Sequence, residues 1–377
     1  MRIAIVTNIL APYRVPLFNN LSCKLNNELK VFLCAATEPN RHWVWPNNIN
    51  FKYEIGSTFS CSITPTKTFY LNFGLVRRLI RFRPDVIVSG GIGCLSLMSY
   101  ISAKLCGSRL ILWGEGIIGF DGIVGLMMWP IRRFLARMAD GCIASSTSAA
   151  EFFRFYGAPA GRIKISMITF DKESFSRSLV RAKQSYGKIK EENRLPSTVI
   201  LYVGQLEAYK GVDLLLLAFQ AMLKEQIAAD LVIIGTGRQS KKLQSIVNPP
   251  YRKRIHFLGP MQPHELIPYF AIADLFVLFS RSEPFGLVIA EAVSAGLPVM
   301  CSRYAGAAYD LVEDGENGYL VEPSDISTNS ALMAKIIRNE GLRKQMAKRS
   351  LEIAEKCDLH LAVNSMADAI GLFSNRV

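Results

Sequence analysis

The sequence predicts an α/β protein with two doubly wound parallel sheets. Its 377 residues are too many for one ordinary core and suit two domains of roughly 150 to 200 residues each. Half of the residues are hydrophobic and a fifth are charged, which is typical of a folded globular chain. Short apolar runs alternate with longer helical stretches, and this alternation indicates parallel strands joined by helices.

Two series of apolar runs are predicted to form the strands. The first series consists of Ile3–Thr7, Leu29–Leu33, Asp85–Ser89, Arg109–Trp113 and Gly141–Ala144. The second consists of Val199–Val203, Asp230–Ile234, Arg254–Phe257, Leu275–Leu278 and Leu297–Met300. The polar segment Arg177–Pro196 separates the two series. We therefore predict Rossmann-like domains at 1–176 and 197–355, a linker at 177–196, and a C-terminal helix at 356–377 that could pack back on the N-terminal domain.

The predicted sheets also indicate where a ligand binds. Open α/β sheets bind ligands beyond the carboxyl ends of their strands. Two such domains facing each other across a cleft would place both sets of loops around one ligand.

The positive charge of the chain lies mainly in its N-terminal half. Of the net charge of +13, residues 1–180 contribute +11, from 21 Lys and Arg against 10 Asp and Glu. Such a surface attracts nucleic acid, anionic lipid headgroups or a phosphate-bearing acceptor. No finger spacing, basic helix with heptads or aromatic ribonucleoprotein motif is present, so nucleic acid is not expected as a partner.

Cysteine usage and the N-terminus favour the cytoplasm. The eight cysteines form no CxxC pair and are expected to be free core thiols. The chain passes from Met1-Arg2 directly into a predicted strand, without the features of a secretory leader. Val86–Ala103 is uncharged over 18 residues, but its β-branched start and central glycines favour a strand, a turn and a helix over a membrane span. Peripheral contact with the inner face of the membrane is left open by the charge.

The most informative segment runs from Phe279 to Ala292, after a predicted strand. A helix starting near Phe285 would point its unpaired N–H groups and positive dipole end outward, which makes an anion site suited to a diphosphate. Gly286 would let the ligand approach closely. Glu283 and Glu291 could then bracket a bound diphosphate. The plainer alternative is that Glu283 caps the helix and Glu291 pairs with a nearby cation.

Glu283 and Glu291 within EPFGLVIAEA resemble the E-x7-E signature of family-4 retaining glycosyltransferases, which have the two-domain GT-B fold. The segment Tyr202–Leu206 with Lys210-Gly211 is similar to that family's G-R-L-x-x-x-K-G loop. Three further segments follow in the family's order, namely Gly235-Thr236-Gly237, Phe257-Leu258-Gly259 and Asp314-Gly315-Glu316-Asn317-Gly318. The resemblance is dense over residues 199–325.

The resemblance implies a sugar transfer from a nucleotide-sugar donor, with UDP or GDP as the nucleotide, to an acceptor hydroxyl with retention of configuration. It implies that Lys210 binds the donor diphosphate, that Glu283 lies by the transferred sugar and that Glu291 holds the ribose. Other residues implied on the donor side, in the C-terminal domain, are Gly204, Gln205, Gly235, Phe285, Gly286 and Leu287. It implies no metal and no cofactor, and none of the four histidines forms a metal-spaced pair.

Gln205 and Glu115 differ from the residues that this family usually has at these positions. Gln205 stands where the family usually has Arg, and a neutral amide cannot offset phosphate charge. Either another cation, such as Arg281, Arg303 or an N-domain arginine, compensates, or diphosphate binding is weaker. Glu115, between two glycines after a predicted strand, stands where many members carry a His near the sugar. It is a candidate catalytic residue, and a solvent-facing turn residue is the alternative.

The N-terminal domain is expected to bind the acceptor. Asn8–Phe18 resembles the opening of those family members that build bacterial surface polysaccharides, and it makes Tyr13 and Arg14 candidate acceptor-side residues. Packing of Tyr13 on the core explains the same residues. Gly125–Met138 mixes large apolar residues with three arginines and is either a basic amphipathic helix on an anionic membrane or a core helix with a solvated face. A lipid-linked or glycan acceptor would suit this half.

Other functions of the same fold remain alternatives. A nucleotide-sugar epimerase or a sugar phosphorylase would share the architecture. A non-catalytic nucleotide-sugar binding partner is favoured by Gln205 and opposed by Glu283, Glu291 and Lys210. A dehydrogenase is not favoured, because Gly91-Ile92-Gly93 lacks a third glycine and no acidic residue follows at the usual interval.

Overall fold

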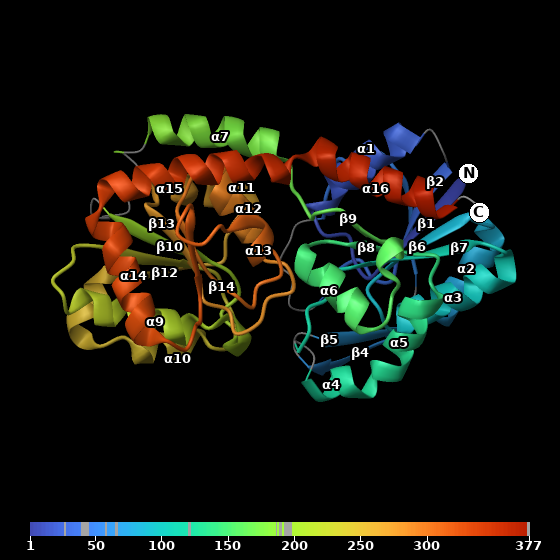
Figure 1. The fold of residues 1–377 in the computed structure, drawn as a ribbon, viewed down its shortest axis with the longest axis horizontal. Helices are drawn as coiled ribbons and strands as arrows, with labels where there is room; N and C mark the ends of the chain where they lie inside the picture. Colours follow the sequence, from blue (N-terminus) through green and yellow to red (C-terminus); the bar gives the residue numbers. More distant parts are fainter. Residues whose placement is uncertain are drawn as a thin grey trace. The chain divides into compact units, whose positions relative to one another are not determined.

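The computed structural model contains two compact α/β units, shown in Figure 1. The first consists of Met1–Phe170 and Asp358–Val377, and the second of Asp171–Cys357. The residues that the structure describes are 1–25, 28–38, 45–56, 59–64, 67–119, 122–185, 187, 191 and 198–374.

The first unit is built on a seven-stranded parallel sheet. Its strands, in spatial order, are β3 (Lys52–Ile55), β2 (Glu28–Leu33), β1 (Arg2–Thr7), β6 (Val86–Gly90), β7 (Arg109–Gly114), β8 (Gly141–Ala144) and β9 (Ile163–Ile165). The five predicted strands are confirmed to within one residue at either end. The two edge strands, β3 and β9, were not predicted, because their mostly exposed side chains form no apolar run.

Both faces of this sheet are buried. In β1, Ile3 and Ile5 belong to one apolar cluster, while Ala4 and Val6 belong to the other. The first face is covered by α1 (Arg14–Leu25) and α16 (Leu359–Ser374). The opposite face is covered by α2 (Phe73–Phe82), α3 (Cys94–Cys106), α5 (Trp129–Met138) and α6 (Thr147–Phe155).

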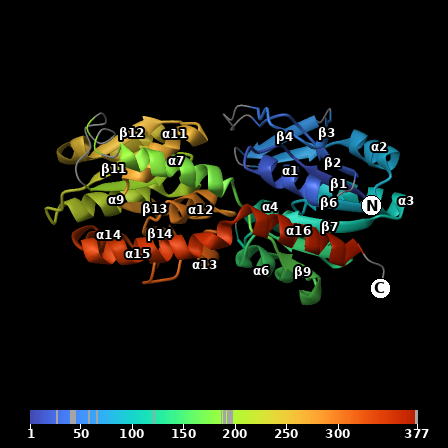
Figure 2. The same ribbon diagram turned by 90° about the horizontal axis from the view of Figure 1, so that it is seen from above.

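Helix α16 joins the first unit although it follows the second in sequence. It packs beside α1 (Figure 2). Its buried residues recur at helical spacing, and Met366 and Ile370 are fully buried in the core. The Ser166 hydroxyl donates a hydrogen bond to the Ala362 carbonyl (3.1 Å). The C-terminal helix therefore completes the core of the N-terminal unit.

Three smaller features complete the first unit. An antiparallel hairpin is formed by β4 (Phe59–Thr64) and β5 (Lys67–Leu71), and a 3-10 turn spans Ala160–Arg162. The residues predicted as one helix at 125–138 form two, α4 (Gly122–Met127) and α5. The helix breaks at Met128 because of Pro130, which lies in the first turn of α5. Proline is tolerated in the first turn of a helix but not in the interior of a longer one.

The uncharged stretch 86–103 forms strand β6, a turn and most of helix α3, as predicted. Among the residues that the structure describes, no helix has both the length and the apolar content needed to cross a bilayer.

The second unit is built on a six-stranded parallel sheet. Its strands, in spatial order, are β12 (Ile255–Gly259), β11 (Asp230–Ile234), β10 (Val199–Val203), β13 (Leu275–Leu278), β14 (Val299–Ser302) and β15 (Gly318–Val321). Its helices are α7 (Lys172–Gln184), α9 (Val212–Leu223), α10 (Ser240–Ile246), α11 (Pro263–Ile272), α12 (Leu287–Ser294), α13 (Ala308–Leu311), α14 (Ile326–Arg338) and α15 (Glu340–Ile353), with 3-10 turns at Ala208–Lys210, Pro249–Arg254 and Ala354–Cys357.

This sheet lies between two layers of helices (Figure 1). Helices α9, α10 and α14 lie on one side, and α7, α11, α12 and α15 lie on the other. The first strand in sequence, β10, is flanked by β11 on one side and β13 on the other. The chain therefore reverses its direction of winding between β10 and β13, and this is the point of an open sheet at which ligands bind.

The boundary between the units differs from the one expected. The segment predicted as a linker, 177–196, starts inside α7, which belongs to the second unit. Phe175 and Leu179 of α7 are buried, and the rings of Phe175 and Phe270 meet edge to face at 5.7 Å. Because this apolar stripe packs on α11, the units divide after Phe170. Residues 192–197 lie outside the described residues.

The seven cysteines whose side chains the structure describes are free thiols. Cys34, Cys142, Cys301 and Cys357 are buried in the core, whereas Cys23 is exposed. Burial raises the pKa of Cys34 to about 11, so this thiol stays protonated and unreactive.

The packing of α16 predicts a test of the first unit. Met366→Ala should lower its free energy of unfolding by about 2–4 kcal/mol, because the side chain is fully buried. The four tryptophans all lie in the first unit, so their fluorescence during denaturant unfolding reports on that unit alone. Leu361→Ala is the matched control, since Leu361 is exposed on the same helix and its loss should change little. Equal midpoints for both variants would contradict this role of α16.

Candidate functional site

The site is centred on two loops that leave neighbouring strands of the second unit. The loop after β10 ends in the 3-10 turn Ala208–Lys210, and the loop after β13 contains Glu283. The Lys210 ammonium forms an ion pair with the Glu283 carboxylate. Their side chains are only 13% and 10% exposed. Two residues predicted from separate motifs are therefore brought together at the point where the sheet reverses its winding.

The backbone holds Glu283 from both sides. Its N–H donates to the Tyr304 carbonyl at 3.1 Å, and its own carbonyl accepts from the Gly306 N–H at 2.8 Å. A Cβ at Gly306 would lie 1.9 Å from the Pro284 carbonyl oxygen, so only glycine fits there. The loop after β14, of which only Arg303 was a candidate in the sequence, thus fixes the position of this carboxylate.

The loop carrying Lys210 is held by Arg281. Its N–H donates to the Tyr209 carbonyl (2.8 Å), and its guanidinium forms two bonds to Asp213, of 2.8 and 2.7 Å. Burial alone would raise the pKa of Asp213, but the bonds from Arg281 lower it, so Asp213 remains charged. Arg281, a candidate to compensate for Gln205, is therefore engaged in holding these two loops together.

Two glycines set how closely the loops approach. Gly211 has a φ of +64°, and a Cβ there would lie 2.0 Å from the Phe279 carbonyl oxygen. Gly235 has a φ of +144°, and a Cβ there would lie 1.8 Å from the Gly204 carbonyl oxygen. A left-handed backbone and direct contact with another backbone both require glycine. Gly204 and Gly235 thus shape the loops where the sequence predicted donor contacts.

Gln205 is held by two tyrosines that the sequence analysis did not identify. The Tyr209 hydroxyl donates to the Gln205 side-chain oxygen at 2.8 Å, and the Tyr202 hydroxyl donates to the Gln205 carbonyl at 3.0 Å. Tyr202 is completely buried, and burial raises its pKa well above the ordinary value. The neutral amide therefore has a defined position in the loop beside Lys210.

Helix α12 begins at Leu287, with Gly286 as its N-cap at a φ of 87°. Phe285 is buried beneath the turn, and its carbonyl accepts from the Ala307 N–H at 2.8 Å. The first amides of the helix, those of Leu287 and Val288, have no carbonyl partner within the helix. The predicted helix start is confirmed two residues later than expected. Its unpaired amides lie next to the loop that carries Glu283, where the sequence predicted an anion site.

Glu291 lies in the second turn of α12 and is partly buried. Burial raises its pKa to about 7. We find no ion-pair partner for Glu291 within the described part of the chain, and Glu283 contacts Lys210 where Gly286 caps the helix. Glu283 is therefore not the helix cap, and Glu291 is not in an ion pair with any described residue, which was the plainer alternative for these two carboxylates.

The first unit holds a second cluster at the carboxyl ends of its strands. Arg14, at the start of α1, donates to Glu115 (2.8 Å) and to the Thr7 hydroxyl (2.6 Å). Its guanidinium lies 4.8 Å from the centre of the Trp113 ring. Burial would lower the pKa of Arg14, but Tyr13 and Glu115 raise it, so it stays charged. The sequence analysis treated Arg14 and Glu115 separately, whereas the structure joins them in one ion pair.

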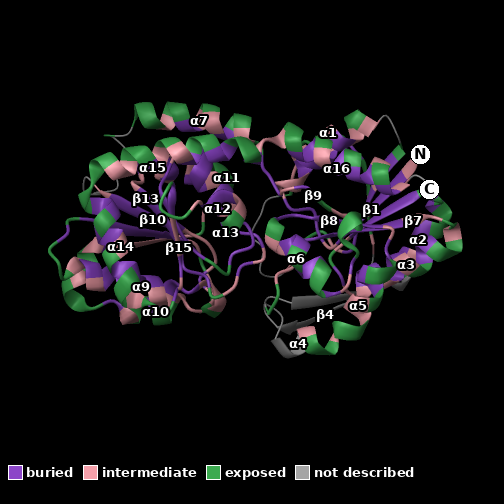
Figure 3. Cartoon of the chain, viewed as in Figure 1, coloured by how far each residue is buried: buried purple, intermediate pink, exposed green. Residues whose placement is uncertain are grey.

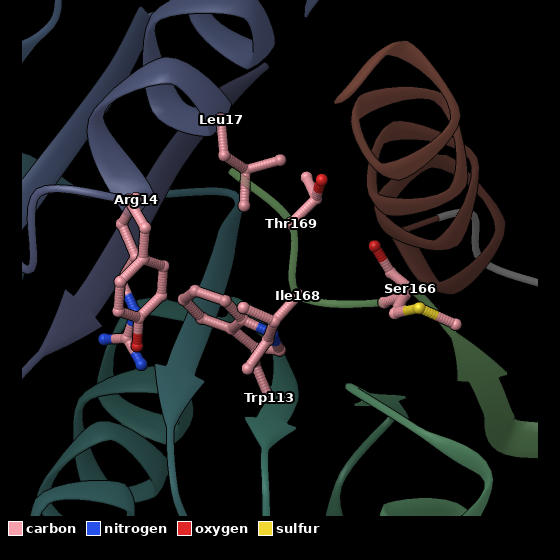
Figure 4. A pocket seen from close by; sticks show the side chains of 8 residues that line it. Arg14, Leu17, Trp113, Ser166, Ile168 and Thr169 are labelled. Carbon is pink, nitrogen blue, oxygen red and sulfur yellow. The ribbon is translucent and has the colours of Figure 1, made fainter. Parts of the chain in front are cut away.

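A small hollow lies beside this ion pair, as Figure 4 shows. Its volume of about 10 Å³ is the room for one water molecule. The residues that line it are Tyr13, Arg14, Leu17, Trp113, Ser166, Met167, Ile168 and Thr169. Residues 166–169 therefore border the predicted acceptor-side residues. Nothing in their neutral sequence had indicated a place in this site.

The chain is similar to known glycosyltransferases in sequence and in fold. Residues 187–352 match the family described as glycosyl transferases group 1. The chain is 26% identical to sulfoquinovosyl transferase SQD2 of Arabidopsis thaliana over 304 residues, which cover 78% of this chain and 57% of that protein. The chain thus spans little more than half the length of this relative.

Solved structures match the chain over almost its whole length. HepE of Anabaena, in complex with UDP, superposes with a TM-score of 0.76 at 18% identity and covers 99% of this chain and 100% of its own. WaaG, a glycosyltransferase involved in lipopolysaccharide biosynthesis, gives a TM-score of 0.69 at 16% identity, with 97% and 98% covered. The predicted fold is confirmed. The chain has the GT-B fold, and its residues 187–352 are similar to the glycosyl transferases group 1 family.

Proposed function

We propose that this protein transfers a sugar from a nucleotide-sugar donor to an acceptor hydroxyl, with retention of configuration, in the synthesis of a bacterial surface polysaccharide. The observation that carries the proposal is the pairing of Lys210 with Glu283 beside the N-terminus of α12. HepE was solved with UDP-glucose, and WaaG is involved in lipopolysaccharide biosynthesis, which supports this class of donor and product. A UDP-sugar is the favoured donor, with a GDP-sugar as the alternative.

Each donor group has a partner of suitable chemistry at this site. Lys210 and the first amides of α12 would hold the diphosphate, since both present positive charge. Glu291 would accept hydrogen bonds from the ribose hydroxyls, and Glu283 would position the transferred sugar. Gln205 would donate to a phosphate oxygen without offsetting its charge.

Catalysis would be mainly electrostatic. As the bond to the anomeric carbon stretches, positive charge grows on the sugar ring and negative charge on the leaving diphosphate. Lys210 and the helix N-terminus would stabilise the leaving group without a metal ion. The acceptor would attack on the face that the diphosphate leaves, and a donor phosphate oxygen would take its proton.

The acceptor would bind at the first unit. Glu115 would contact the reacting sugars while Arg14 holds its carboxylate, and Tyr13 would line the approach. The positive charge of this half suits a lipid-linked or glycan acceptor that carries phosphate. We place the protein in the cytoplasm, in peripheral contact with the inner face of the membrane.

The primary test is donor turnover. The purified protein, supplied with membrane extract as acceptor, should release nucleoside diphosphate from a UDP-sugar but not from other nucleotide sugars, and EDTA should leave the rate unchanged. Lys210→Ala and Glu283→Ala should each lower kcat roughly 100- to 1,000-fold, the cost of one electrostatic contact to a transition state. Lys224→Ala is the matched control, since Lys224 is an exposed lysine at the end of α9.

Two outcomes would replace the proposal. Tight UDP binding without release, even with acceptor present, would indicate a nucleotide-sugar binding partner. Conversion of the donor without any acceptor would indicate an epimerase.

The Lys210–Glu283 ion pair predicts an unusual binding result. In the free protein Glu283 neutralises the cation that the diphosphate requires, and it also repels the incoming charge. Glu283→Gln should therefore bind UDP about five-fold more tightly, from removal of about 1 kcal/mol of charge competition, while losing turnover. Calorimetry would measure the affinity, with Glu316→Gln as an exposed control of equal charge change. Weaker UDP binding by Glu283→Gln would show that Glu283 does not compete for Lys210.

The raised pKa of Glu291 predicts a pH dependence. Its folded pKa of about 7 exceeds its ordinary value of 4.5, so the stability it contributes is present below pH 4.5 and is lost as the pH rises through 7. Between pH 5 and pH 8 the free energy of unfolding of wild type should therefore fall relative to that of Glu291→Gln by about 1–3 kcal/mol. At pH 8 the variant should be the more stable protein. Thermal unfolding across this range measures the difference.

The same carboxyl should govern ribose binding. The affinity for UDP-glucose, whose phosphates do not titrate near neutrality, should rise between pH 6 and pH 8 as Glu291 ionises. In Glu291→Gln this rise should vanish. An identical pH profile in the variant would exclude Glu291 from the nucleotide site.

A further inference from the structure

Tyr209 contacts two of the side chains that are proposed to bind the donor diphosphate. Its hydroxyl donates to the side-chain oxygen of Gln205 at 2.8 Å. The centre of its ring lies 5.3 Å from the Lys210 ammonium, a distance at which a cation is attracted to an aromatic face. Tyr209 therefore reaches Gln205 through its hydroxyl and Lys210 through its ring, so a substitution can remove one contact and keep the other.

The backbone of Tyr209 is held at several points. Its carbonyl accepts from the Arg281 N–H, on the loop after β13, at 2.8 Å. The next residue, Lys210, donates its N–H to the Glu207 carbonyl at 2.9 Å. Glu207 is fixed in turn by Arg238, whose guanidinium donates to its carboxylate at 2.9 and 3.1 Å. The Tyr209 hydroxyl therefore extends from a turn whose position is set by two neighbouring loops.

The backbone of Gln205 is held just as closely. Strand β10, which leads into this loop, is almost wholly buried (Figure 3). The Tyr202 hydroxyl donates to the Gln205 carbonyl at 3.0 Å. The following N–H, that of Leu206, donates to the Thr236 carbonyl at 2.9 Å. The Tyr209 hydroxyl thus acts on a side chain whose own backbone is already fixed.

The orientation of the Gln205 amide decides how it meets a phosphate. An amide carries an acceptor oxygen at one end and a donor NH2 group at the other. The oxygen would repel a phosphate, whereas the NH2 group would donate a hydrogen bond to it. Because the Tyr209 hydroxyl binds the oxygen, the NH2 end is the one that can serve a phosphate.

The Gln205 side chain also gains from being held before the donor arrives. Glutamine has several rotatable bonds, and fixing them on binding lowers the affinity for the ligand. A contact that fixes them in the free protein removes part of this cost. The saving matters more for glutamine than for arginine, because a neutral amide forms a weaker hydrogen bond with a phosphate than a guanidinium does.

We propose that Tyr209 is a positioning residue of the donor site, whose hydroxyl holds the Gln205 amide with its NH2 group toward the donor diphosphate. The inference rests on the proposed function, in which Gln205 donates to a phosphate oxygen. It adds the residue that makes a neutral side chain effective at this position. Tyr209 acts through Gln205 rather than by its own contact with the donor.

Calorimetric titration with UDP and with GDP tests the proposal without requiring turnover. Tyr209→Phe removes the hydroxyl and keeps the ring beside Lys210. It should weaken binding of the nucleotide that wild type binds by about five-fold, the effect of one neutral hydrogen bond. Gln205→Ala should weaken binding at least as much. The double variant Tyr209→Phe/Gln205→Ala should bind like Gln205→Ala, because the hydroxyl then has no amide to hold.

Kinetics separate this role from an effect on the catalytic ion pair. Tyr209→Phe should raise the donor KM about five-fold and leave kcat within about two-fold, since the amide binds the diphosphate both before and during transfer. A disturbed pair of Lys210 and Glu283 would instead lower kcat. Tyr251→Phe is the matched control, because Tyr251 is half-buried in the turn before β12, at the amino ends of the strands. Its nucleotide affinity should equal that of wild type, and circular dichroism should show the same fold in every variant.

Either of two results would overturn the inference and leave the proposed function intact. One is equal nucleotide binding by Tyr209→Phe and wild type, which would show that the hydroxyl is not needed. The other is the same loss of affinity on adding Tyr209→Phe to wild type and to Gln205→Ala, which would show that Tyr209 does not act through Gln205. Absence of nucleotide binding by wild type would overturn the proposed function together with the inference.

Discussion

The pairing of β10 with β13 is the constraint on which the proposed nucleotide site depends. These strands are adjacent in the sheet but separated in sequence by two strands and their helices, and they pair in parallel through Ile200 with Leu275 and Leu201 with Phe276. Parallel pairing brings their carboxyl ends to the same edge, and the loops beyond them must share one space. Arg281, Gly211 and the Glu283 backbone then hold these loops in contact.

The proposed nucleotide site carries one cation and two carboxylates. Lys210 and Glu283 neutralise each other in a mostly buried position, where losing one partner costs several kcal/mol. Glu291 is partly buried, and burial raises its pKa to about 7, so its charge is disfavoured. A polyanion with hydroxyl groups would bind the cation and the carboxylates at once. This combination of charges supports the proposed nucleotide-sugar donor as the ligand.

Ion pairs connect separate segments of the chain within both units. In the second unit, Arg238 pairs with Glu207 and Arg349 with Glu313, and these pairs connect loops and helices. In the first unit, which holds most of the net charge, the mostly buried Arg14 pairs with Glu115. Pairs of this kind support the local structure of each unit, while the net positive charge attracts anions.

The sequence by itself determined the elements, because the signals for them are local. Apolar runs predicted ten strands, and the Gly286 region predicted the start of α12. Edge strands β3 and β9 were not predicted, since their mostly exposed side chains leave no apolar run. Edge strand β15 (GYLV), whose side chains are buried or half-buried, was not predicted either. Pro130 divides a helix that periodicity alone had joined. Resemblance, rather than spacing, supplied the roles of Lys210 and Glu283.

Tertiary structure alone decided which distant residues meet. Lys210 contacts Glu283, 73 residues away, and Arg14 contacts Glu115, 101 residues away. It also decided that Arg281 pairs with Asp213, whereas the packing of the C-terminal helix on the first unit had been predicted and is confirmed. Such contacts depend on the order of strands in a sheet, and periodicity along the chain carries no information about that order.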